Sequence, residues 1–215
     1  METMWRMNMG TQLKNPSQHS AAAANSSSPE QLLQRYAAGE RDFSDMQLIG
    51  ADLRGVNLSG ADFARSQLMG ANLSHAVLNA TNLSEANLRG ANLSQANLFS
   101  TFLSGANLDQ ALLRSANLTE ADLSGASLVN ADLSDACLHL TCLSEANLTG
   151  ANLTGVKMCG AKLWKANLTH ANLLGADLCD ANLCEANLWG ANLTASDTSE
   201  TVLTGAVMPQ GEIHN

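Results

Sequence analysis

Three residues that can bind metal or undergo oxidation recur at intervals of twenty: His139, Cys159 and Cys179. If residues twenty apart stack about 4.8 Å from one another, the two cysteines fall within the Cα separation of a disulfide. We therefore treat Cys159 and Cys179 as a candidate redox pair. The competing interpretation is that Cys has replaced polar residues at outward positions. Structural zinc normally requires four converging ligands, so three collinear residues predict no metal site and no cofactor.

The sequence contains no motif of a known catalytic centre. It has no G-x-S-x-G, G-x-G-x-x-G, Walker loop or H-E-x-x-H motif. The five cysteines are an odd number, which is not typical of a secreted disulfide framework. The sequence therefore predicts no catalytic residues and no enzymatic activity.

A five-residue repeat must position all of these side chains. An apolar residue stands at every fifth position from Phe43 to Leu193, and 28 of these 31 positions are Leu. An α-helix turns about 100° per residue, so the row would wander around it, and a flat strand alternates with period two. The pattern instead predicts three extended residues, with Ala inward, Asn or Asp outward and Leu inward, followed by two residues that turn the chain.

The repeat resembles the pentapeptide repeat family. The motif A-[DN]-L-[ST]-x, as in Ala71-Asn-Leu-Ser-His, continues without a gap over residues 42–195. The resemblance implies an all-β fold, a right-handed quadrilateral parallel β-helix with twenty residues per coil and about eight coils. Charged residues twenty apart, such as Asp45 and Arg65, alternate in sign, which agrees with that coil length.

Helix signals precede the repeats. Ser28 can act as N-cap, Pro29 occupies the first position, Gln31 completes a capping box and Gly39 can end the helix. Solenoids need capped ends, so we expect this short N-terminal helix to cover the first coil. The alternative is that the helix binds a partner.

The sequence thus divides into four parts. Thr198 occupies a Leu position, which predicts an irregular end to the array. The predicted parts are a disordered tail at 1–28, a capping helix at 29–40, a pentapeptide repeat β-helix at 41–195, and a degenerate last coil with the C-terminal tail at 196–215.

Several outward positions depart from the polar consensus and are candidates for an interaction surface. Aromatic and basic side chains gathered on an acidic rod suit a protein interface. Tolerated variation of the surface is the competing explanation. The candidates are Phe99, Phe102, Leu112, Lys157, Lys162, Trp164, Lys165 and Trp189.

Charge and composition restrict the partners. The formal net charge is −9, which disfavours direct binding to nucleic acid. No apolar stretch is long enough to cross a membrane and no secretory signal is evident, so we expect a cytoplasmic protein, monomeric or weakly dimeric.

Three functional hypotheses remain. The first is a non-catalytic scaffold that binds a protein partner of unknown identity, with a regulatory or signalling role. The segments Leu33–Phe43 and Gly205–His214 resemble the ends of cyanobacterial family members, including those of heterocyst differentiation. The second hypothesis is a DNA-mimicking inhibitor or protector of DNA gyrase, and the third is a structural spacer without a specific partner.

Overall fold

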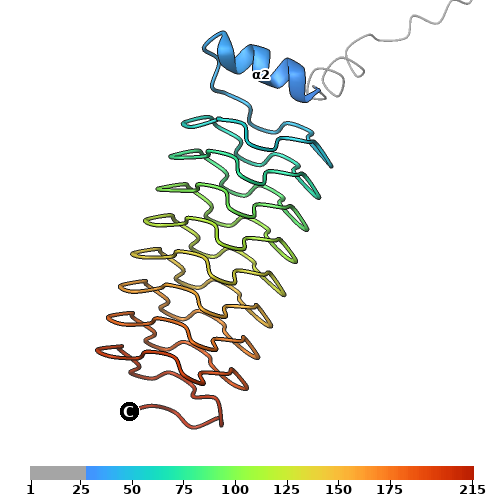
Figure 1. Cartoon of the computed structure of the whole chain (residues 1–215). Helices are drawn as coiled ribbons and strands as arrows, with labels where there is room; N and C mark the ends of the chain where they lie inside the picture. Colours follow the sequence, from blue (N-terminus) through green and yellow to red (C-terminus); the bar gives the residue numbers. More distant parts are fainter. Residues whose placement is uncertain (1–27) are drawn as a thin grey trace, which may run out of the picture.

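The chain winds into a rod with one helix across its first coil (Figure 1). The computed structural model describes residues 28–215. Helix α2, Pro29–Ala37, lies at one end of the rod and the C terminus at the other. The disordered tail predicted for residues 1–28 lies outside the described residues, apart from Ser28. None of the helical structure in the described part has the length and apolar character needed to cross a bilayer.

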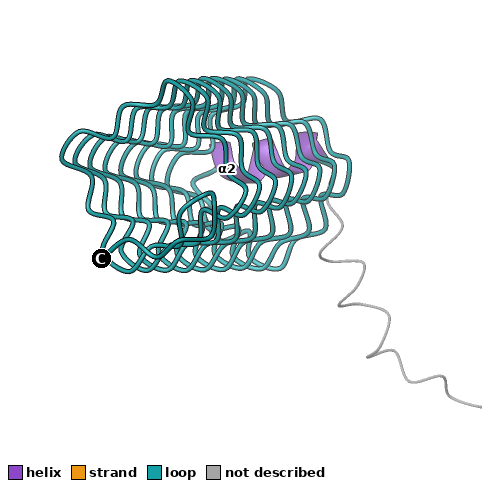
Figure 2. Cartoon of the chain, turned by 90° about the horizontal axis from the view of Figure 1, so that it is seen from below, coloured by secondary structure: helices purple, strands orange, loops and turns teal. Residues whose placement is uncertain are grey.

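The coils pair through parallel β-bridges between residues twenty apart. Asp52 bridges Asn72, for example, and Asn72 in turn bridges Asn92. Four repeats therefore complete one coil, and successive coils stack in register, as the end-on view shows (Figure 2). The three-residue strands expected from the sequence are reduced to isolated bridges, because the two residues directly after each Leu already form the next turn.

The repeat gives nearly every backbone N–H an acceptor. In the repeat of Asn72, the N–H of Asn72 donates to Ala51 in the preceding coil, and those of Leu73 and His75 donate to carbonyls of the next coil. The N–H of Ala76 closes the turn onto Leu73. The remaining N–H, that of Ser74, donates to the side chain of Asn72 at 3.2 Å. Asn or Asp at this position thus satisfies a donor that no backbone carbonyl takes.

Each corner requires a left-handed residue. The second residue after each Leu has a positive φ, whether it is glycine, as at Gly160 with φ 68°, or not, as at Leu140 with φ 57°. Glycine adopts this conformation without strain, whereas a bulky residue does so at an energetic cost. The backbone conformation therefore explains why Gly, Asn or Asp stands at many corners, but it does not explain the leucine at position 140.

Leucine and alanine side chains fill the axis of the rod. Leu113 and Ala111 are both 0% exposed, and the same holds for most of their counterparts. Threonine replaces Ala at a few inward positions, where its hydroxyl finds a carbonyl: Thr101 Oγ1 donates to Leu78 O at 2.8 Å. The predicted alternation of inward Ala and Leu with outward Asn is confirmed.

Helix α2 covers the first coil with its apolar face. The capping box predicted for Ser28 and Gln31 is present. Leu32 is fully buried, and the ring of Tyr36 lies 6.5 Å from that of Phe43, which stacks on Phe63 at 5.3 Å. These contacts close the N-terminal end of the core and protect the edge of the first coil from pairing with another chain.

The C-terminal end is closed less completely. The last residues fold back so that Ile213 pairs antiparallel with Val207, and the N–H of His214 donates to Ala206 O at 2.9 Å. The last coils border a partly open cavity of about 190 Å³, lined by leucines together with Met208, Ser196, Thr198 and Thr201. The irregular end predicted from Thr198 therefore corresponds to a gap in the core.

Filling this cavity should stabilise the rod. We expect Thr198→Leu to raise the free energy of unfolding by about 0.5–2 kcal/mol, because it restores an apolar side chain at a Leu position. Chemical denaturation of the variant measures the change. Thr194→Leu is the matched control and should leave stability unchanged, because Thr194 is exposed, as Thr198 is, but does not line the cavity. Equal effects of the two substitutions would contradict the role of the cavity.

Candidate functional site

The four faces of the rod decide which candidate residues can act together. Each face is a stack of repeats twenty residues apart, so we name a face by one of its residues. Along the chain, the Phe99 face is followed by the Phe102 face, the Trp189 face and the Leu112 face. Residues ten apart in sequence lie half a coil apart, on opposite faces.

The Phe99 and Phe102 faces meet at an apolar corner. Phe99 is 39% exposed and Phe102 is 52% exposed, on the two sides of this corner. Leu140, two coils further along at the corner itself, is 60% exposed, and its side chain covers Gly160. Leu140 is not among the candidates predicted from the sequence. The signal that could have identified it is a leucine at a turn position, where Gly or a polar residue is usual. We call these two faces and the corner between them the Leu140 surface.

Basic residues lie on the same surface. Lys157 belongs to the Phe99 face and bridges Cys137, whereas Lys162 belongs to the Phe102 face and bridges Cys142. Both are exposed, and within residues 28–215 no carboxylate lies within ion-pair distance of either ammonium group. Phe102 and Lys162 occupy the same column three coils apart, a separation of about 14 Å at one strand spacing per coil.

A Trp–Lys–Glu cluster forms the far side of the Phe102 face. Lys165 Nζ lies 4.2 Å from the centre of the Trp164 ring and 3.5 Å from Glu185 Oε2. Trp164 Nε1 donates to Glu185 Oε1 at 3.4 Å. These contacts hold the indole, which is 37% exposed, against the rod. The basic charge of Lys165 is thus partly compensated within the chain, unlike that of Lys157 and Lys162.

Two candidates do not belong to this surface. Leu112 is exposed, but it lies ten residues from Phe102 and therefore on the opposite face. Trp189 lies on the next face, near the C-terminal end, where its ring packs edge-on against His170 at 4.6 Å. The structure thus places six of the eight predicted residues on the Leu140 surface and separates the other two from it.

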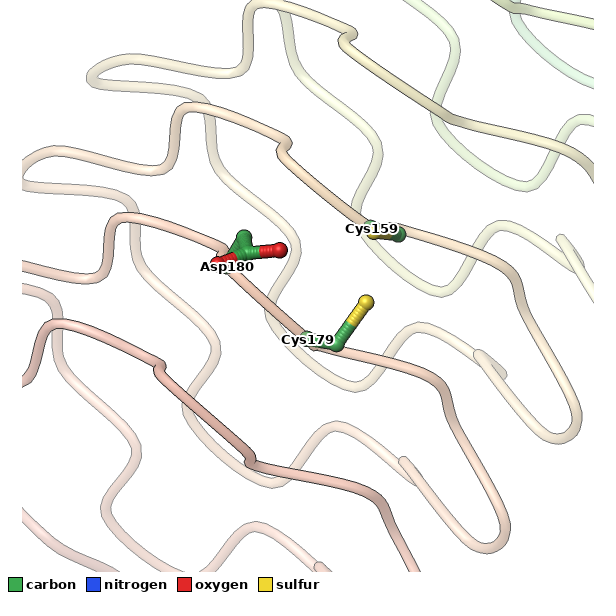
Figure 3. A group of neighbouring side chains, drawn as sticks. All are labelled: Cys159, Cys179 and Asp180. Carbon is green, nitrogen blue, oxygen red and sulfur yellow. The ribbon is translucent and has the colours of Figure 1, made fainter.

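The predicted redox pair lies next to the same corner. Cys159 and Cys179 are half-buried free thiols in stacked coils, joined by the hydrogen bond from the Gly160 N–H to Cys179 O at 2.9 Å. Their sulfur atoms and an oxygen of Asp180 all lie within 4.8 Å of one another, whereas His139 is not part of this group (Figure 3). The Cys159 sulfur, partial desolvation and the Asp177 carboxylate raise the pKa of the Cys179 thiol to about 12.

Cys142, on the Phe102 face, has the opposite environment. Partial burial acts to raise the pKa of its thiol, but hydrogen bonds with Ser124 and Ser144 outweigh burial and hold the pKa below its ordinary value. The Ser124 hydroxyl lies 3.1 Å from the sulfur and the Ser144 hydroxyl 3.6 Å from it. Cys142 and Cys179 lie on the two faces that meet at this corner, and their thiols differ in acidity because their hydrogen-bonding partners differ.

These features define a β-helical repeat scaffold that displays outward side chains at fixed spacing. A model of pentapeptide repeats matches residues 47–84, 66–105, 76–114, 106–144, 143–164 and 165–197, with eight copies in all. The chain therefore belongs to the pentapeptide repeat family, as the resemblance of its repeats predicted.

Solved structures of other repeat proteins are similar to this chain. HetL, a pentapeptide repeat protein involved in heterocyst differentiation regulation from the cyanobacterium Nostoc, is 34% identical, with 87% of this chain and 100% of HetL covered and a TM-score of 0.39. Rfr23 from the cyanobacterium Cyanothece is 26% identical, with 85% and 99% covered and a TM-score of 0.31. QnrB1, a plasmid-mediated fluoroquinolone resistance protein, is 18% identical, with 73% and 88% covered and a TM-score of 0.42. The comparison with curated proteins found no match.

Proposed function

We propose that this protein is a non-catalytic scaffold of the cytoplasm that binds a protein partner through the Leu140 surface. The scaffold is a right-handed rod of about eight coils, monomeric or weakly dimeric. The grouping of six candidate residues and Leu140 on two adjacent faces is the observation that supports this proposal most directly. A regulatory or signalling role in a cyanobacterium is the more specific form of the proposal.

The residues of this surface are not those that the fold requires. Phe102, Lys157 and Lys162 occupy the position at which Asn or Asp accepts a hydrogen bond from the backbone two residues later. A phenyl ring or an ammonium group offers no acceptor, so each of these repeats gives up one structural hydrogen bond. Local departures of this kind are typical of positions that serve a function other than stability.

Charge and polarity indicate the chemistry of the partner. Among the described residues no carboxylate lies within ion-pair distance of the Lys157 or Lys162 ammonium group, although Asp177 is stacked on Lys157. Phe102 and Leu140 are exposed apolar side chains of the same surface. A partner with an apolar groove rimmed by Asp or Glu would complement both features. The three lysines lie on a chain whose formal net charge is −9, and Asp122 and Asp177 lie on the same two faces, so the lysines would pair with individual acidic residues of the partner and do not make the region basic overall.

Matched asparagine substitutions on opposite faces test the proposal. We expect Phe102→Asn to weaken binding of the partner by at least about tenfold, because exposed aromatic residues often dominate interface energies. The same variant should be slightly more stable than the native protein, since Asn restores the acceptor for the Ser104 N–H. The partner is captured from host lysate on native protein and identified by mass spectrometry, and its affinity is then measured with purified components.

Leu112→Asn provides the control for this experiment. It makes the same kind of replacement at the same position of a repeat, but on the opposite face. It should restore a turn hydrogen bond without affecting partner binding. A partner that binds Phe102→Asn and Lys162→Asn as tightly as the native protein would contradict the proposed surface. Loss of the partner only in Leu112→Asn would also contradict it and would place the binding surface on the opposite face.

The DNA-mimic alternative has one supporting feature, the net charge of −9. It predicts inhibition of gyrase supercoiling by micromolar protein, with little dependence on Phe102 or Lys162. A spacer without a specific partner predicts neither gyrase inhibition nor any partner whose capture depends on the substituted surface. The two assays together distinguish the three functions.

A further inference from the structure

We propose that Cys159, Cys179 and Asp180 form a site for a soft or borderline divalent cation, with Zn²⁺ as the ion that fits best. Their ligand atoms, two sulfurs and one carboxylate oxygen, all lie within 4.8 Å of one another (Figure 3). The column of His139, Cys159 and Cys179 predicts no metal site. In the structure Asp180, and not His139, joins the two cysteines, and this group is compact.

The geometry of the corner brings the third ligand in. Cys159 and Cys179 stack in adjacent coils, and the Cys179 sulfur points from its coil toward that of Cys159 (Figure 3). Asp180 occupies the left-handed corner position, with φ 55°, which places its carboxylate beside the sulfurs and not along the next face. Gly160 occupies the equivalent corner beside Cys159 and has no side chain of its own there, although the Leu140 side chain lies over it from the other side of the coil stack.

The separations suit one ion after small side-chain rotations. Zinc binds thiolate sulfur at about 2.3 Å and carboxylate oxygen at about 2.0–2.2 Å, so two sulfurs on one tetrahedral ion stand about 3.8 Å apart. Because both cysteines are only half-buried and Asp180 is exposed, rotation about their χ1 angles can bring the ligand atoms within that distance. Water would occupy the fourth position, as in three-ligand zinc sites.

The electrostatics of the site favour a cation. Asp177 accepts a hydrogen bond from the Cys179 N–H at 3.1 Å, so two carboxylates flank this thiol. Lys157 bridges Asp177 in the stacked coil and is the basic residue of the neighbourhood, but it lies outside ion-pair distance of that carboxylate. Zinc binding replaces the two thiol protons, which are released to solvent, and the divalent ion compensates the negative charge that the thiolates would otherwise place beside two carboxylates.

Zinc titration of the reduced, untagged full chain tests the site. Calorimetry in an oxygen-free buffer with a phosphine reductant should show one Zn²⁺ per chain. Cys159→Ser, Cys179→Ser and Asp180→Asn should each weaken binding by more than about tenfold, since even the loss of outer partners weakens metal sites 10- to 100-fold. Asn tolerates the left-handed corner, so Asp180→Asn removes the ligand while retaining the backbone.

Cys184→Ser is the matched control, because Cys184 is also half-buried but belongs to a neighbouring face. It should bind zinc like the native protein. Alkylation mapped by mass spectrometry gives an independent readout: bound zinc should protect Cys159 and Cys179 but not Cys142. Unchanged affinity in Cys159→Ser, or protection of other cysteines instead, would overturn the proposal. The site does not depend on the proposed partner, so either proposal can fail without the other.

Discussion

Replacing Leu113 with Ala should lower the free energy of unfolding by about 2–5 kcal/mol, whereas the same replacement at its neighbour Leu112 should change it by less than about 0.5 kcal/mol. Leu113 is 0% exposed and Leu112 is 37% exposed, although the two leucines are adjacent in sequence. Truncation of Leu113 leaves a cavity in the axis of the rod, which neighbouring coils fill only in part because their backbone is held by the bridges.

Denaturation followed by circular dichroism and by hydrogen exchange measures both effects. Exchange is needed because the stability of repeat arrays is a sum over neighbouring units, and a weakened coil can open without unfolding of the whole rod. Leu113→Ala should accelerate exchange most strongly in the coils that contact residue 113. Similar losses at the two positions would mean that the leucine row is not selectively inward.

The inward leucine row, the corners and the N-terminal cap could be predicted from sequence because each follows from a local rule. A leucine at every fifth position can be buried only if the chain turns once per repeat. Arg65 and Asp45 form an ion pair with a separation of 2.8 Å. This pair confirms that charged residues twenty apart in sequence are neighbours in adjacent coils. Exposed pairs of this kind contribute little to stability, but here the pair reports the register between coils.

The grouping of the surface residues could not be predicted in the same way. Phe102 and Leu112 belong to one coil and are both candidates for one interaction surface, yet half a coil separates them. Asp180 was overlooked because the repeat pattern gives the direction of inward and outward side chains on a face, but not of side chains at a left-handed corner. Such directions depend on the backbone conformation at each corner, which the five-residue period does not specify.

The asparagine position connects stability with function. Asn and Asp there satisfy one N–H per repeat and also form ladders between coils, as when Asn82 Nδ2 donates to Asp62 Oδ1 at 3.0 Å. A residue that interrupts this ladder weakens the rod slightly and exposes a side chain of different chemistry. Interruptions therefore identify positions where the surface differs from what the fold alone requires, and the largest of them, Phe102, lies on the Leu140 surface.

Deleting one residue should damage the rod more than deleting five. Removal of residues 126–130 preserves the repeat pattern, because Ala131 then follows Gly125, and should cost about 1 kcal/mol or less. Removal of Val129 alone leaves one residue to turn the corner after Leu128 and breaks the turn hydrogen bond between the Ala131 N–H and Leu128 O, now 3.0 Å. We expect a loss of at least about 3 kcal/mol, measured by chemical denaturation.

The five-residue deletion should also separate folding from binding. It turns every residue after the deletion by one face relative to those before it, so Lys162 would no longer share a face with Phe102. If both residues contact the same partner, this variant should fold with nearly native stability and yet lose binding by at least about tenfold. Retained binding would show that one side of the deletion suffices, which would contradict a surface that extends across several coils. The deletion therefore tests whether the coil register, and not only the fold, determines recognition.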